Sequence, residues 1–136
     1  MMKSILKTVC PLLLTLTAAI LISGCLRNEN NSRTIAELVE HLNNKGLTIE
    51  SVTPTLPDMI LAQDGIFVRI GGKDVQLFKY DTRIKKQKEK LDKIYSNGKI
   101  TILGVDFPTA TNGSFIMLNY KGNPEEAKLL EAFESF

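Results

Sequence analysis

The stretch MILAQDGIFVRIGGKDVQLFKY, residues 59–80, decides the fold expected for this chain. It contains two dipeptides typical of tight turns, Asp64-Gly65 and Gly71-Gly72, each between runs rich in β-branched and aromatic residues. Such dipeptides accept the positive φ angles that two-residue hairpin turns require. The stretch therefore predicts a three-stranded antiparallel meander.

Upstream of this meander, residues 34–46 predict an amphipathic helix. Apolar residues recur there with the spacing of one helix face, and Thr34 and Glu37 have the spacing of a capping box. Gly46 supplies the helix stop. Residues 47–52 alternate in polarity and predict a strand, after which two prolines are expected to interrupt regular pairing.

Downstream of the meander, residues 82–98 predict a second helix. Asp81 is a suitable N-cap, and Asn97-Gly98 is a suitable end. The apolar stripe is sparse, which favours a position against a flank of the sheet. The expected stripe consists of Ile84, Lys88, Leu91 and Tyr95.

The C-terminal third predicts two strands and a third helix. The strands are expected at 99–103 and 114–120, with a loop between them at 104–113. The helix signal is Asn123-Pro124-Glu125-Glu126, which combines an N-cap, a proline at the first helical position and acidic residues in the first turn. The expected apolar side of this helix consists of Ala127, Leu130 and Phe133.

Together these elements predict one α+β domain over residues 34–136. We expect a mostly antiparallel sheet of about five or six strands, with three helices packed on one face of the sheet.

The first 24 residues have the pattern of an export signal. Lys3 and Lys7 precede an uncharged run, and the apolar core over residues 9–22 fits the ~7–15 residues of a signal peptide. That core is shorter than the ~20 residues that a membrane-spanning helix needs. An ordinary signal peptide with an incidental cysteine is the alternative to a lipoprotein signal.

The end of this core, Ile22-Ser23-Gly24-Cys25, resembles the lipobox of bacterial lipoproteins. The resemblance implies cleavage before Cys25, a diacylglycerol on its thiol and a further acyl chain, such as palmitate, on the new amino terminus. Leu26 follows the cysteine, which implies the outer membrane if the host has two membranes. The expected location is therefore the extracytoplasmic side of the cell envelope. Residues 64–136 are loosely similar to small bacterial exported proteins without an established activity.

Removal of the leader changes the composition. Cys10, Lys3 and Lys7 would be lost, which leaves 15 basic and 15 acidic side chains and no cysteine other than Cys25, whose thiol is expected to carry the lipid. A near-neutral domain is not expected to bind nucleic acid. Disulfide formation and cysteine-dependent chemistry are excluded. Residues 25–33 are polar and are expected to tether the domain within ~25 Å of the membrane.

No sequence motif indicates a metal, a cofactor or a catalytic group. His41 is expected to be an exposed helix histidine, since no further ligands accompany it. The glycines at 71–72 are expected to form a turn, not an anion cradle, and the sequon at 112–114 is expected to be incidental. Acidic residues in loops leave a small envelope hydrolase as an alternative. The residues in question are Asp58, Asp64 and Asp106.

The helix at 82–98 carries the first candidate binding surface. Four cations share one face at spacings of three and four residues, and an anionic surface or an acidic partner would attract them. An ordinary solvated face is the alternative. The four cations are Arg83, Lys86, Lys90 and Lys93.

Two proline-containing loops, 53–60 and 106–113, form the second candidate surface. Leu56, Met59 and Phe107 are expected to contact a partner protein, or else to pack under the sheet as extra core. The favoured function is a noncatalytic binding or envelope-accessory role in a membrane-anchored lipoprotein. A surface inhibitor or exclusion factor is a further alternative.

Overall fold

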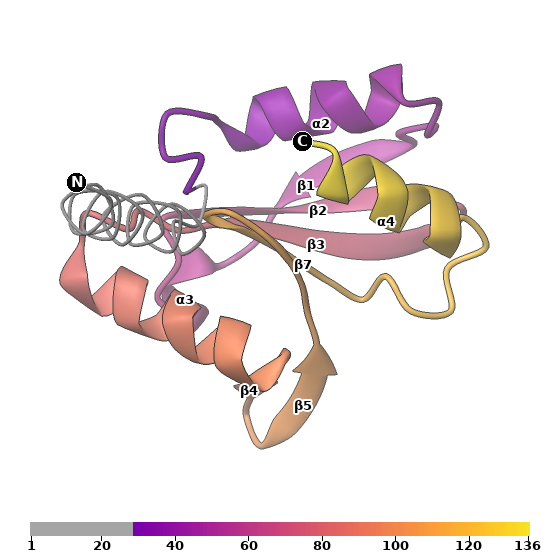
Figure 1. The fold of residues 1–136 in the computed structure, drawn as a ribbon. Helices are drawn as coiled ribbons and strands as arrows, with labels where there is room; N and C mark the ends of the chain where they lie inside the picture. Colours follow the sequence, from indigo (N-terminus) through magenta and orange to yellow (C-terminus); the bar gives the residue numbers. More distant parts are fainter. Residues whose placement is uncertain (1–28) are drawn as a thin grey trace, which may run out of the picture.

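The computed structural model describes residues 29–136, so the expected leader and the expected lipidation site Cys25 lie outside the described residues. It has the expected α+β fold, with three helices and a mostly antiparallel sheet (Figure 1). The elements are α2 (Ile35–Asn44), β1 (Ser51–Pro54), η1 (Pro57–Ile60), β2 (Asp64–Ile70), β3 (Lys73–Lys79), α3 (Lys85–Asn97), β4 (Lys99–Ile102), β5 (Val105–Pro108), β6 (Ala110–Asn112), β7 (Phe115–Leu118) and α4 (Glu126–Glu134).

The main sheet has five strands in the order β1-β2-β3-β7-β6, and every neighbouring pair is antiparallel. The expected turn between β2 and β3 is confirmed. Ile70 pairs with Lys73, and Gly71 and Gly72 have φ angles of 60° and 74°. Both glycines thus supply the positive φ that this two-residue hairpin needs.

The prediction of a second turn in the meander, at Asp64-Gly65, is wrong. Asp64 and Gly65 are the first residues of β2, and the segment before them forms the 3₁₀ helix η1 instead of a strand. Pro57 starts η1, and Leu61 ends it in a left-handed conformation with φ 58°. Gly65 is needed for close packing, because a Cβ there would lie 2.5 Å from the ring of Phe78.

The first strand of the meander is β1, which begins at Ser51, four residues further along the sequence than the strand expected at 47–52. Residues 47–50 cross from α2 to the sheet, and Leu47 is buried on the way. Pro54 belongs to β1, where it pairs with Ile66. A proline is tolerated there because β1 is an edge strand.

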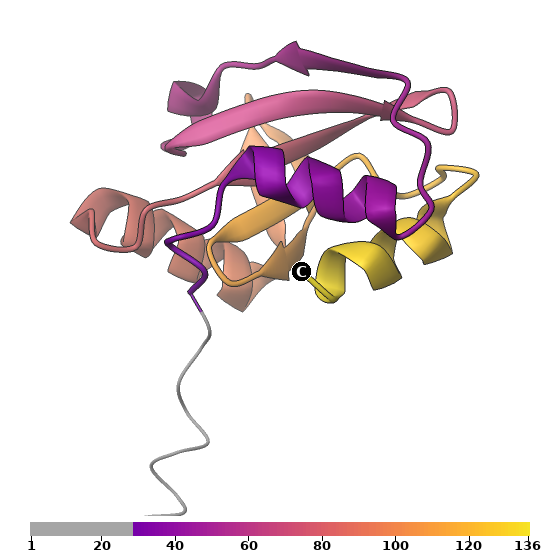
Figure 2. The same ribbon diagram turned by 90° about the horizontal axis from the view of Figure 1, so that it is seen from above.

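The helices cover both faces of the sheet. The expectation that all three helices pack on one face is therefore wrong. Helices α2 and α4 lie side by side on one face, and α3 lies on the other (Figures 1 and 2). Adjacent strand residues explain this arrangement, since Leu77 packs into the first core and Phe78 into the second. Both faces of the central strands are therefore apolar.

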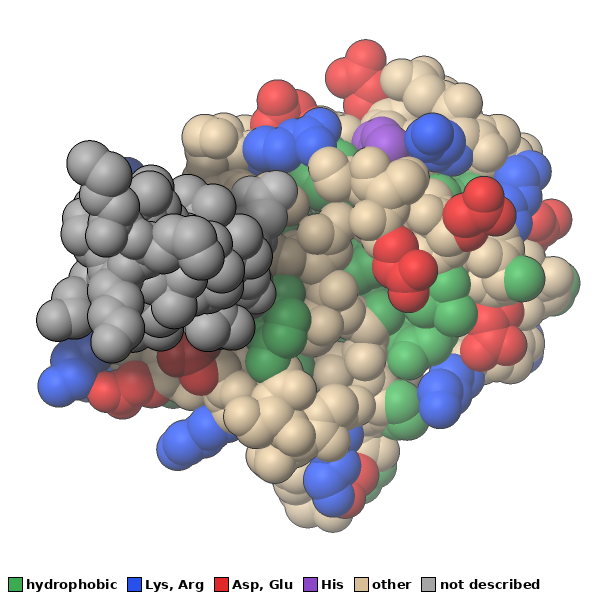
Figure 3. Space-filling view, in the orientation of Figure 1, with side chains coloured by type: hydrophobic (Ala, Val, Ile, Leu, Met, Phe, Trp, Pro, Cys, Tyr) green, Lys and Arg blue, Asp and Glu red, His purple; other side chains and the backbone are tan. Residues whose placement is uncertain are grey.

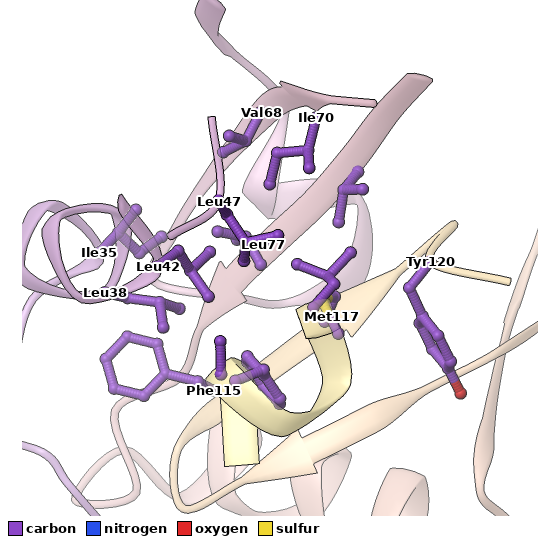
Figure 4. Close-up of a cluster of buried hydrophobic side chains, with 14 residues drawn as sticks. Ile35, Leu38, Leu42, Leu47, Val68, Ile70, Leu77, Phe115, Met117 and Tyr120 are labelled. Atoms are coloured by element: carbon purple, nitrogen blue, oxygen red, sulfur yellow. The ribbon is translucent and has the colours of Figure 1, made fainter. Parts of the chain in front are cut away.

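The larger core lies beneath α2 and α4. Ile35, Leu38 and Leu42 of α2 point toward Leu77 and other side chains of the sheet (Figure 4). The capping box that starts α2 is present as expected, with Thr34 and Glu37 bonded to each other's backbone N–H groups.

The smaller core lies beneath α3. Leu91 and Ile94 are its buried helix residues, whereas Ile84 is 45% exposed and lies before the first helical residue. The expected N-cap is wrong, because the Asp81 carboxylate accepts from the backbone N–H and side chain of Arg83 and does not cap α3. The expected end at Gly98, with φ 65°, is confirmed.

The expected loop at 104–113 contains two strands, β5 and β6. Strand β5 pairs with β4 as a separate hairpin, and β6 joins the edge of the main sheet beside β7. The β4–β5 turn consists of Leu103 and Gly104, with φ angles of 49° and 80°. Leu103 is an unusual residue for such a turn, which explains why composition did not predict it.

Helix α4 begins two residues later than its sequence signal predicts, with Glu125 instead of Asn123 as the N-cap. Asn123 organises the preceding turn by accepting a hydrogen bond from the Glu125 N–H at 2.9 Å. The apolar side of α4 also differs from the expected one, since Ala127 is exposed. The buried residues are Leu129, Ala132 and Phe133.

Candidate functional site

An apolar groove lies beside α3, on the part of the second sheet face that this helix leaves open. Its volume is about 190 Å³. Three segments that are far apart in the sequence line it. The lining residues are Thr55, Leu56, Met59, Ile60, Phe67, Gln76, Phe78, Ile102 and Phe107. We call this set the apolar groove.

The sheet forms the floor of the apolar groove. Phe67 pairs with Gln76 across β2 and β3, and Phe78 follows on the same face as Gln76. Phe67 and Gln76 are only partly buried, because no helix covers them. Within residues 29–136, the Gln76 side-chain amide has no hydrogen-bond partner, so it offers a polar anchor in an apolar floor.

One wall is η1 with the residues that precede it. Leu56 is 68% exposed and Met59 is 56% exposed. Tyr80 fixes the end of this wall, since its hydroxyl donates to the Ile60 carbonyl at 2.9 Å. Burial raises the pKa of Tyr80 far above its usual value, so the phenol keeps the proton that this bond requires.

The opposite wall is the β4–β5 hairpin, whose two faces differ. Ile102 and Phe107 line the groove, and Val105, which pairs with Ile102, continues the same apolar face and is 55% exposed. The other face is polar. There, Lys99 and Thr101 donate to the Asp106 carboxylate at 2.7 and 2.6 Å.

These hydrogen bonds hold the pKa of Asp106 below its ordinary value, with the bond from Lys99 as the largest cause. Charged side chains of both signs lie together at the bottom of the molecule in Figure 3, where Figure 1 places this hairpin. Asp106 therefore ties the two strands of the hairpin together and is not a free carboxylate.

The structure brings together all three residues expected at a partner-binding surface. Leu56, Met59 and Phe107 line the same groove, although about fifty residues separate the two loops. Phe107 is partly buried and packs against the smaller core, so it contributes to the core, as the alternative predicted, and also lines the groove. Phe67, Gln76 and Ile102 were missed, because their place in the groove depends on strand pairing.

The cationic face of α3 differs from its expected composition. Arg83 precedes the helix and is paired with Asp81 at 2.9 Å, which lowers the pKa of that carboxyl. Lys86, Lys90 and Lys93 lie on the helix, and no ion pair within residues 29–136 involves them. The neighbouring pairs Lys85–Glu89 and Lys88–Asp92 do form.

The other candidate residues do not form a common site. Asp58 lies in η1, and Asp64 accepts from the N–H of Gly65 at the start of β2. His41 is half-buried instead of exposed, because its Nε2 lies 2.9 Å from both the Ala132 carbonyl and the Ser135 hydroxyl. It therefore joins α2 to α4.

A second apolar hollow lies between α2 and the first two strands. It has a volume of about 370 Å³ and includes Val39, Val52 and Ile66. The part of the chain that the structure describes contains no group of three His, Cys, Asp or Glu side chains placed to hold a metal ion. Among the helices at 29–136, none has the length and apolar character needed to cross a bilayer.

Searches for similar proteins gave no family or relative. No protein-family model matches the chain, and no significant match was found among curated proteins or solved structures. The fold and the apolar groove are therefore the features from which a function can be argued.

Proposed function

We propose that this protein is a bacterial lipoprotein, anchored at Cys25 on the extracytoplasmic side of the cell envelope, whose domain binds an envelope protein through the apolar groove. The role is noncatalytic. The convergence of Leu56, Met59 and Phe107 on one groove is the observation that carries the binding role. The lipobox pattern at Ile22–Cys25 carries the anchor.

The groove suits a segment of a protein better than a small molecule. Its volume of about 190 Å³ is below the ~300–1,000 Å³ typical of small-molecule pockets. Methionine and aromatic side chains are enriched in protein interfaces, and Met59, Phe67 and Phe107 supply them here. The Gln76 amide can bond the backbone of a bound segment, while the apolar walls hold its side chains.

The groove can be tested by photocrosslinking in cells. With a photoreactive residue at Met59, we expect one discrete product, and Leu56→Ser is expected to reduce its yield at least tenfold because it removes an apolar contact. Leu56 is 68% exposed, so this change is expected to alter stability by less than about 0.5 kcal/mol.

Val52→Ser is the matched control, because Val52 is 48% exposed on another part of the surface. This variant is expected to leave the product from Met59 unchanged. Equal losses with Leu56→Ser and Val52→Ser would contradict the groove as the binding site. So would a product of equal yield from a photoreactive residue at Lys121.

The anchor predicts a specific covalent product. The native chain is expected to begin at Cys25, to carry the mass of its acyl chains and to partition into detergent. Several acyl chains make such attachment stable, since each buried methylene adds ~0.8 kcal/mol. Cys25→Ser is expected to abolish both properties. Intact-mass measurement and detergent-phase partitioning check this, and cleavage at another residue would contradict the lipobox.

A further inference from the structure

The described chain enters the domain at the turn before α3. Thr82, which is 7% exposed, donates its hydroxyl hydrogen to the Glu29 carboxylate at 2.6 Å. The Asn31 side chain both donates to the Thr82 hydroxyl and accepts from the Thr82 backbone N–H. Lys79 donates to the Asn31 carbonyl at 2.9 Å. Residues expected to be free tether are thus bonded to the folded domain.

This attachment shortens the reach between Cys25 and the domain. Three residues separate Cys25 from Glu29. Four Cα–Cα steps at ~3.3–3.6 Å span at most ~14 Å, against ~25 Å for a tether that is free as far as residue 32. A lipid on Cys25, which rests on the proposed function, would hold the Thr82 turn and the start of α3 beside the lipid headgroups.

The surface that begins at this turn is cationic. Helix α3 contains five lysines but only two acidic residues, Glu89 and Asp92. Both acids have lysine partners one helical turn away. Lys86, Lys90 and Lys93 have no acidic partner within residues 29–136 and follow one face of the helix at spacings of four and three. In Figure 3, Lys and Arg side chains lie along the lower left edge together with acidic ones, where Figure 1 places α3.

We propose that Lys86, Lys90 and Lys93 dock on anionic phospholipid headgroups of the membrane that holds the anchor. Two independent features agree on this occupant: the short connection to Cys25 and the excess positive charge next to it. Each lysine near an anionic membrane surface is expected to favour the docked orientation about fivefold. Docking would fix the orientation of a domain that the acyl chains alone leave free to rotate.

The test uses the acylated full chain in two kinds of vesicle, neutral phosphatidylcholine and phosphatidylcholine mixed with phosphatidylglycerol. Acetylation of each lysine is followed by mass spectrometry. On anionic vesicles, Lys86, Lys90 and Lys93 are expected to react about fivefold more slowly than on neutral ones. Lys45 and Lys121 are expected to react equally on both. The protection is expected to vanish when the ionic strength rises from about 0.01 M to about 1 M, because the Debye length falls from about 30 Å to about 3 Å.

Charge reversal supplies the matched control. Lys86→Glu/Lys90→Glu is expected to abolish the protection of Lys93, whereas Lys45→Glu/Lys121→Glu, with the same change in net charge, is expected to preserve it. Equal reactivity of the three lysines on both vesicles, with the chain still anchored, would overturn the docking and leave the anchor intact. Release of the chain from both vesicles on washing would overturn the anchor, and with it the short reach on which the docking depends.

Discussion

Replacing Phe115 with alanine is expected to lower the free energy of unfolding by about 3–5 kcal/mol, the usual cost of removing a buried aromatic ring. Phe115 is 0% exposed in β7, an interior strand of the main sheet that pairs with β3 and β6. Its ring meets that of Phe136 edge to face, with centroids 5.2 Å apart. The change would leave a cavity between the sheet and two helices, which surrounding side chains cannot fill without moving (Figure 4).

Urea unfolding followed by circular dichroism would measure this loss. Val52→Ala is the control, because this side chain is 48% exposed on the edge strand β1 and its loss is expected to cost less than about 0.5 kcal/mol. A loss below about 1 kcal/mol for Phe115→Ala would contradict the burial of this ring in the larger core. If the alanine variant does not fold, Phe115→Leu is expected to fold with a smaller loss, since it fills more of the space.

Replacing Asn123 with alanine is expected to cost about 2–4 kcal/mol. The Asn123 side chain is buried, and it donates to the Ile70 carbonyl at 2.8 Å and accepts from the Glu125 N–H at 2.9 Å. It thereby ties the end of β2 to the turn that begins α4. Alanine would leave the buried Ile70 carbonyl and the partly buried Glu125 N–H without these bonds, and an unsatisfied buried group costs about 1–3 kcal/mol.

Two further variants test whether the loss of stability comes from the hydrogen bonds of the Asn123 side chain or from any replacement of a surface or buried asparagine. Asn97→Ala, at the exposed end of α3, is expected to cost less than about 1 kcal/mol. Asn123→Asp keeps a side-chain oxygen that can accept from the Glu125 N–H. It replaces the NH2 donor with a second oxygen, which, when ionised, repels the Ile70 carbonyl oxygen. The folded state would then favour the protonated acid, so the loss is expected to shrink as the pH falls through the raised pKa. A loss that does not depend on pH would contradict the bond to Ile70.

Local signals in the sequence were enough for several elements. Thr34 and Glu37 predicted the start of α2, because a capping box uses only residues within one helical turn. Gly71-Gly72 predicted the β2–β3 hairpin and Gly98 the end of α3, because the need for a positive φ is also local. The α+β class followed from the sum of such signals.

Local signals failed where another contact, near or far along the chain, competed with them. Asp81 has a good N-cap side chain, yet it pairs with Arg83, and Thr82 beside it bonds to residues about fifty positions earlier. Asp64-Gly65 has the composition of a turn, yet Gly65 is required because Phe78 packs against its α-carbon. Strands β3 and β7 place buried apolar side chains on both faces of the sheet, and only sheet pairing shows that each face needs its own helix layer.

The candidate site shows the same division. Composition identified Leu56, Met59 and Phe107 as apolar residues in polar, proline-containing segments. It could not show that the segments meet, because their approach depends on the β4–β5 hairpin and on the bond from Tyr80 to Ile60. Phe67 and Gln76 became candidates only when the open part of the sheet face was known.

The sequence by itself determined the features that depend on neighbouring residues: the start of α2, the end of α3, the glycine turn, the α+β class, the apolar candidates and the lysine spacing on α3. The tertiary structure alone decided which distant residues share a surface, namely the apolar groove and the attachment of Glu29 and Asn31 to Thr82. The physical reason is the range of the interactions. Caps and turns are fixed within a few residues, whereas grooves and attachment points arise from packing between segments that the chain brings together only on folding.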